Sequence, residues 1–152
     1  MRMVALAAII GCIIAAPAAA QQGVSLDSSV FIERTGHTDD GRIARRIEPA
    51  SRLVKGDRVV LVLEWTTGAD GKSFAVTSPI PGTLSFRRSG NDGEQVSVDG
   101  GKSWGELGEL RIREGATTRL ASAGDVTHVR WRISRREAVR GSGLITYSAV
   151  VR

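Results

Sequence analysis

The sequence is poor in cysteine and histidine, and each shortage excludes a class of site. Its 152 residues include one cysteine, Cys12, and two histidines, His37 and His128. A single cysteine cannot form an internal disulfide, and no cysteine–histidine spacing typical of a zinc site is present. Nucleophilic hydrolysis needs a nucleophile, a base and an orienting acid, and neither histidine has such a context. We therefore expect no catalytic residues, no metal and no cofactor.

Lysine is also scarce, and most of the positive charge is carried by arginine. Three lysines stand against eighteen arginines, and the formal net charge is +5. The arginines include three doublets, and the two members of a doublet on a strand point to opposite faces. The doublets are Arg45-Arg46, Arg87-Arg88 and Arg135-Arg136, with Arg130, Arg132 and Arg140 near the last. The cluster is either a solvated surface or a patch for acidic polymers or lipid headgroups. Nucleic acid is not expected, because no basic pattern is interleaved with aromatic residues for base stacking.

Residues 1–20 have the layout of a cleavable signal peptide. Arg2 precedes an apolar, alanine-rich run, and Ala18 and Ala20 are small residues before a cut at about Gln21. The run is shorter than the ~20 apolar residues that span a bilayer, so no permanent membrane span is expected. Cys12 lies inside the run without a polar tether after it, which favours an unmodified residue over a lipidation site. The sequence predicts export to the periplasm, the cell surface or the medium, with residues 21–152 forming one domain.

The rest of the chain alternates with period two, which is typical of half-buried strands. The strongest examples are Val59–Trp65, Val129–Ile133 and Ile145–Val151. Shorter candidates are Val30–Arg34, Ile43–Ile47, Phe74–Thr77, Thr83–Phe86, Gln95–Val98 and Leu107–Arg113. Glycine with Asp or Asn marks the turns between them, and only Leu120–Asp125 could form a turn of helix. We predict an all-β fold, a single immunoglobulin-like antiparallel β-sandwich of about seven to nine strands.

The sharpest local motif is a turn with Ser, Asp, Gly and Trp at fixed spacing. Ser97, Asp99, Gly101 and Trp104 fit the pattern Ser-x-Asp-x-Gly-x-x-Trp, which resembles the Asp-box hairpin of sialidase-like propellers. Asp99 can accept hydrogen bonds from turn amides while the tryptophan packs back over the hairpin, so the pattern predicts a structural turn lock. The alternative is a sugar-contacting surface. Its candidate residues are Trp104, Arg130, Arg132, Arg135 and Arg136.

Three stretches resemble the conserved-repeat domain of unknown function found in bacterial exported and surface proteins. They are Val54–Gly68, with its Val-x-Gly-Asp-like turn, Phe74–Phe86, and Val129–Val151 with its tryptophan strand and glycine turn. Thr67 and Ser78 depart from the asparagine and aspartate usual in that family. Members occur as tandem arrays with anchors, whereas this chain carries one copy. The resemblance implies an immunoglobulin-like sandwich outside the cytoplasm and supplies no catalytic residues.

Three functions are compatible with these features. The first is a non-enzymatic structural or adhesive module that binds an envelope protein or self-associates, for example through a strand edge. The second is a module that binds carbohydrate or an acidic polymer through Trp104 and surface arginines. The third is a hydrolase with an unrecognised carboxylate pair among Glu64, Glu94, Glu106 and Glu109. The missing catalytic set favours the first.

Overall fold

The computed structural model describes residues 23–68 and 71–152. The predicted signal peptide, Cys12 and the expected cut at Gln21 lie outside these ranges. Within them, no helix is long and apolar enough to cross a membrane.

The described residues form ten strands, which confirms the all-β antiparallel sandwich and raises the strand number above seven to nine. The strands are β1 (Val24–His37), β2 (Ile43–Pro49), β3 (Arg58–Thr67), β4 (Phe74–Pro79), β5 (Leu84–Ser89), β6 (Gln95–Ser97), β7 (Arg111–Glu114), β8 (Thr117–Leu120), β9 (His128–Ile133) and β10 (Ser142–Val151). A 3-10 turn η1 (Ala123–Asp125) lies within the stretch expected to be helical. Strand β8 and the four-residue helix α1 (Arg135–Ala138) have no counterpart in the sequence prediction.

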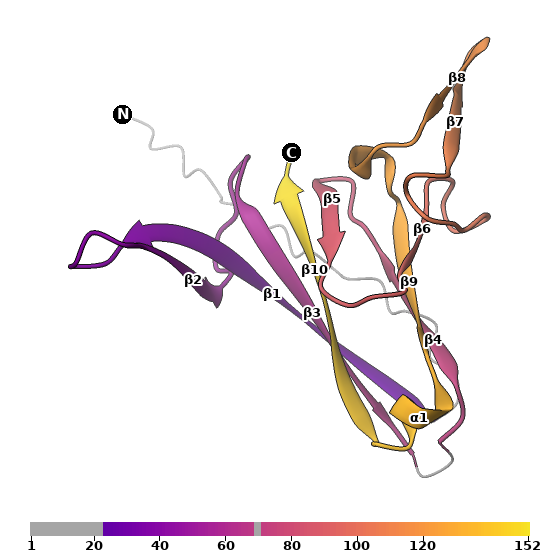
Figure 1. Ribbon diagram of the computed structural model, residues 1–152, viewed down its shortest axis with the longest axis horizontal. Helices are drawn as coiled ribbons and strands as arrows, with labels where there is room; N and C mark the ends of the chain where they lie inside the picture. The colour runs from indigo at the N-terminus through magenta and orange to yellow at the C-terminus, as the bar shows by residue number, and fades with distance from the viewer. Residues whose placement is uncertain (1–22, 69–70) are drawn as a thin grey trace, which may run out of the picture.

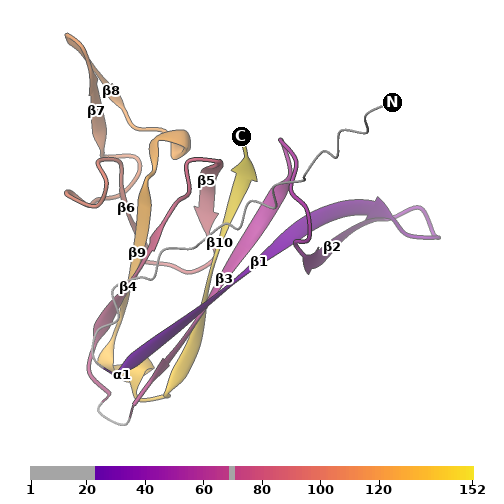
Figure 2. The same ribbon diagram turned by 180° about the vertical axis from the view of Figure 1, so that it is seen from behind.

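The strands form two packed sheets and a separate hairpin. The larger sheet has the order β2-β1-β3-β10-β5 and the smaller sheet has the order β4-β9-β6. The β7–β8 hairpin and the β1–β2 hairpin project from opposite sides of the sandwich (Figures 1 and 2). Because the smaller sheet has only three strands, it leaves part of the long β1 and all of β2 without an opposing layer.

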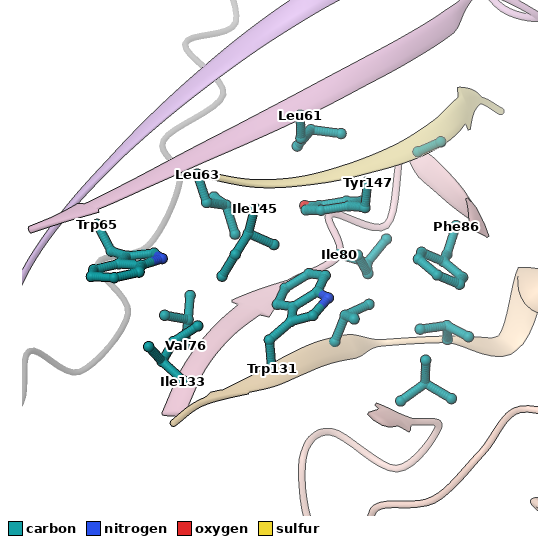
Figure 3. Close-up of a cluster of buried hydrophobic side chains, with 14 of the residues drawn as sticks. Leu61, Leu63, Trp65, Val76, Ile80, Phe86, Trp131, Ile133, Ile145 and Tyr147 are labelled. Atoms are coloured by element: carbon teal, nitrogen blue, oxygen red, sulfur yellow. The ribbon is translucent and has the colours of Figure 1, made fainter. Parts of the chain in front are cut away.

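The core forms where alternating apolar positions of the two sheets meet. Its largest side chains are the aromatic residues of β3, β4, β5, β9 and β10. Figure 3 shows those of β3, β5, β9 and β10. Trp131 stacks on Tyr147 with ring centroids 5.8 Å apart, and Trp65 meets Phe74 edge-on at 5.3 Å. Each of these pairs joins one strand of the larger sheet to one strand of the smaller sheet. Such pairs add to the free energy gained by burying the rings.

Two serines complete the core by bonding the polar atoms of its aromatic rings. The Tyr147 hydroxyl lies 3.0 Å from Oγ of Ser78, and the indole N–H of Trp131 donates to Oγ of Ser89 at 3.0 Å. In both cases the serine belongs to the sheet opposite the ring. No buried side-chain nitrogen or oxygen lacks a partner in the described ranges. The core therefore buries its polar atoms without the cost of unpaired groups.

Gly143 is required by the packing of Trp65. The two residues are paired in register across β3 and β10, and the indole lies over the glycine. A Cβ at Gly143 would overlap Cζ2 of the indole, so a larger residue would displace the ring from the core.

The Tyr147–Ser78 bond predicts non-additive costs of substitution. Tyr147→Phe leaves the Ser78 hydroxyl with only a 3.4 Å contact to the Pro79 carbonyl, and Ser78→Ala leaves the phenol unpaired. We expect each change to lower the free energy of unfolding by about 1–3 kcal/mol, because a buried polar group loses its partner. The double variant should cost clearly less than the sum, as measured by urea denaturation. Additive costs would contradict a direct bond between the two groups.

Candidate functional site

The N-terminal half of β1 has an open edge. β3 pairs with β1 from Val24 to Glu33, but β2 pairs with it only from Phe31 to His37. At the boundary, the Val30 carbonyl accepts the Ala50 N–H at 3.1 Å, so the polar groups of Val30 point toward the β2 side. Because successive residues of a strand alternate, those of Val24, Leu26 and Ser28 point to the same side. No strand of the described chain pairs with them there.

The outer edge of β2 differs from this segment in its chemistry. β2 carries the Arg45-Arg46 doublet and ends at Pro49, which has no N–H to donate. Charged residues and proline are the devices by which natural sheets discourage pairing with another chain. The open segment of β1, with the sequence Val-Ser-Leu-Asp-Ser-Ser, has one charge and no proline. The two edges are therefore unequal, and β1 offers the better template for an added strand.

The turn after β6 is held by two side chains, Ser97 and Asp99. Asp99 Oδ1 accepts the N–H groups of Lys102 (3.0 Å) and Ser103 (2.9 Å), and Oδ2 accepts the Ser103 hydroxyl at 2.6 Å. The fully buried Ser97 donates its hydroxyl to Asp99 Oδ1 at 2.7 Å and accepts the N–H of Gly101 at 2.8 Å. Gly101 has φ of 90°, which favours glycine. These bonds fix the loop backbone.

Trp104 lies against this turn and is half-buried by contacts with neighbouring residues of the chain. Its indole N–H donates to the Gly101 carbonyl at 3.0 Å, and the ring meets His128 edge-on. The Arg130 guanidinium lies over the ring, 4.3 Å from its centroid, and Gln95 Oε1 accepts two of its N–H groups at 2.8 and 3.0 Å. The cation–π contact occupies one face of the ring, on which a sugar would otherwise be able to stack. This geometry favours a structural role for Trp104.

The predicted arginines do not gather at one place. Arg132 lies two residues after Arg130 on β9, and it is exposed on the same outer face of the smaller sheet. Arg135 and Arg136 are exposed on α1, which follows the last residue of β9 (Figure 1). Trp104 lies at the other end of this strand, beside its first residue, His128. The structure thus brings Trp104 and Arg130 together and leaves Arg135 and Arg136 apart from them.

Sequence reasoning did not single out Gln95, which fixes Arg130, or the contact of His128 with Trp104. The i, i+2 spacing of His128 and Arg130 could have indicated that both side chains lie together near Trp104, since they share the outer face of β9. The open edge of β1 had no such signal, because it depends on where β2 ends. In residues 23–68 and 71–152, no three His, Cys, Asp or Glu side chains are placed to hold a metal ion.

The turn lock predicts a pH-dependent contribution to stability. Hydrogen bonds hold the pKa of Asp99 well below its ordinary 3.8. The largest effect comes from the Ser103 hydroxyl, followed by the Ser103 N–H and the Ser97 hydroxyl. A carboxyl with a depressed folded-state pKa stabilises the fold above its unfolded pKa and loses that effect as pH falls. We expect Asp99→Asn to lower the thermal midpoint at pH 7 and to flatten its decline below about pH 4.

The matched control is Asp92→Asn, which removes an exposed loop carboxylate without a side-chain hydrogen bond to the described residues. Its thermal midpoint should follow that of the unchanged protein from pH 7 to about pH 2. An Asp99→Asn profile parallel to both would show that the ionised carboxylate adds nothing to the turn.

Comparison with known proteins gives no match to a family model, a curated protein or a solved structure. The resemblances to the conserved-repeat domain and to the Asp-box hairpin therefore stay predictions. The features that bear on function are those of the chain itself, namely the open edge of β1 and the side chains on the outer faces of the sheets.

Proposed function

We propose that this chain is a non-enzymatic, exported β-sandwich module that docks on an envelope protein by strand addition at β1. The observation that carries the proposal is the open edge formed by Val24, Leu26 and Ser28. A partner segment in extended conformation would pair with their N–H and C=O groups and continue the five-stranded sheet. A second copy of the chain could present such a segment, so self-association belongs to the same hypothesis.

The side chains of this edge support a specific register. Leu26 is opposite Trp65 in the pairing with β3, and Val24 and Leu26 are half-buried and pack against the core. Ser28, by contrast, is exposed. An added strand with apolar residues at alternate positions would extend the core beside Val24 and Leu26, and its opposite face would remain in water. The backbone hydrogen bonds would supply affinity, and the apolar contacts with Val24 and Leu26 would supply selectivity.

Carbohydrate binding by the surface around Trp104 is the second candidate function. It is supported by the exposed arginine Arg132 beside Arg130, and it would require Arg130 to leave the indole or the ligand to use another part of the ring. The geometry favours the edge, because its polar groups have no partner in the described chain, whereas those of Trp104 and Arg130 are bonded.

The edge can be tested by removing one N–H. Ser28→Pro deletes an outward-pointing donor and places the pyrrolidine ring on the edge, while Ser28→Ala keeps the donor and serves as the matched control. In pull-downs from native envelope extract washed at high salt, we expect Ser28→Ala to retain a protein partner. Ser28→Pro should lose most of it, with the thermal midpoint confirming that it folds.

Equal retention by both variants would contradict docking through β1. Cross-linking that finds only monomer, together with an extract that yields no protein partner, would also overturn the proposal. Polysaccharide released by salt, with binding lost in Trp104→Ala, would favour the second candidate instead.

A further inference from the structure

The outer face of the five-stranded sheet contains a groove to which every strand of the sheet contributes. It encloses about 940 Å³ and lies on the side away from the smaller sheet. Its chemically distinctive side chains are Glu33 on β1, Arg45 on β2, Arg58 on β3, and Arg87 and Arg88 on β5. The floor between them is formed by Val60 and by β10 from Thr146 to Val150. The groove thus crosses the strands.

A β-bulge places both members of the Arg87-Arg88 doublet in this groove. Phe86 pairs with Ala149 and Arg88 pairs with Ser148, so Arg87 is the additional residue and the register shifts there. Phe86 before the bulge is buried, and Ser89 after it bonds Trp131, so both face the core. The expectation that doublet members point to opposite faces is therefore wrong at this position. One extra residue presents two adjacent guanidinium groups to the solvent.

Most of the charge in the groove has no counter-charge from the residues that the structure describes. Among the described residues, Glu33 is the one carboxylate that lines the groove, and it lies 3.5 Å from Arg45. Arg58, Arg87 and Arg88 are exposed, and they make no side-chain hydrogen bond or ion pair with the described residues. Other surface arginines do have such partners, as Arg119 has in Asp125 and Glu114. Three guanidinium groups with unused donors on one concave face form an anion-binding surface.

The shape of the groove limits which anion it fits. From β2 to β5 the sheet is four strand spacings wide, about 19 Å, and Arg58, Arg87 and Arg88 span two of these spacings, about 10 Å. A ligand that meets these three guanidinium groups and fills the groove as far as β2 must therefore be extended. The groove is concave, so a flat membrane would touch its rims and leave the floor empty. Tyr147, the one aromatic side chain among the described lining residues, is 1% exposed, so these residues offer no platform for stacking bases. The floor of the groove carries the hydroxyls of Thr146 and Ser148 beside the apolar side chain of Val60, which suits a sugar chain with hydroxyl groups and apolar ring faces.

We infer that this groove binds an acidic polysaccharide, laid across the strands with its anionic groups on Arg58, Arg87 and Arg88. The site is separate from the Trp104 surface and from the open edge of β1. It does not depend on the strand-addition proposal, because the edge involves β1 before residue 31 and the groove uses Glu33 beyond it.

The probe is a polygalacturonate fragment, with dextran of similar length as the neutral comparison. The full chain is expressed, and the purified protein is used. Its affinity for each polymer is measured by titration calorimetry at increasing salt concentrations. The test variant is Arg58→Gln/Arg87→Gln/Arg88→Gln. The matched control, Arg111→Gln/Arg113→Gln/Arg140→Gln, removes the same charge from exposed residues outside the groove. Thermal midpoints establish that both variants are folded.

We expect polygalacturonate to bind and dextran not to bind. The groove variant should lose about tenfold or more in affinity, since exposed ion pairs contribute roughly two- to fivefold each. The control should lose less than about threefold, the share due to net charge alone.

Equal losses in the two variants would overturn the site, as would dextran binding. Stronger groove-dependent binding of phosphatidylglycerol vesicles or of a single-stranded oligonucleotide would overturn the ligand class. Strand addition is tested separately by Ser28→Pro, which should leave polygalacturonate affinity unchanged.

Discussion

The contact between Trp131 and Tyr147 is the interaction on which the rest of the structure depends. No cysteine is present in the described residues, so within them no disulfide joins the two sheets, which are held together by packing and hydrogen bonds. The rings stack at 5.8 Å, and each has its polar atom bonded by a serine of the opposite sheet. This arrangement fixes both the spacing and the lateral position of β9 over β10 and β5. A purely apolar contact would set the spacing and leave the sheets freer to slide.

The same contact explains the bulge in β5. Ser89 must face the core to bond Trp131, and Phe86 must face it to pack near Tyr147. Three positions separate them, and regular alternation would send one of the two outward. One additional residue resolves the conflict, and its consequence is the pair of arginines on the outer face. The geometry of the candidate anion site thus follows from a constraint inside the core.

The fold class follows from sequence reasoning because alternation in β3, β9 and β10 is strong and both faces are clearly distinguished. The short helix and strand segments were harder to predict from the sequence. The α1 helix has a capping box, Ser134 and Glu137, but only four residues, too few to give a helical period. β8 is mostly exposed, so it carries no apolar alternation. The groove and the open edge could not be predicted, since they depend on a register shift and on where β2 ends.

The two proposed sites use different directions of one sheet. A strand added beside Val24–Ser28 would lie in line with β2, beyond the point where β2 ends at Pro49, and its hydrogen bonds would lie in the plane of the sheet. A polymer in the groove would lie across the strands above that plane, over Arg58 and Arg87. Because Glu33 pairs with Arg58, the groove begins where the open edge has already ended. Both ligands could therefore occupy the sheet together. The module would then hold a polymer on one face while its edge is fixed to a protein.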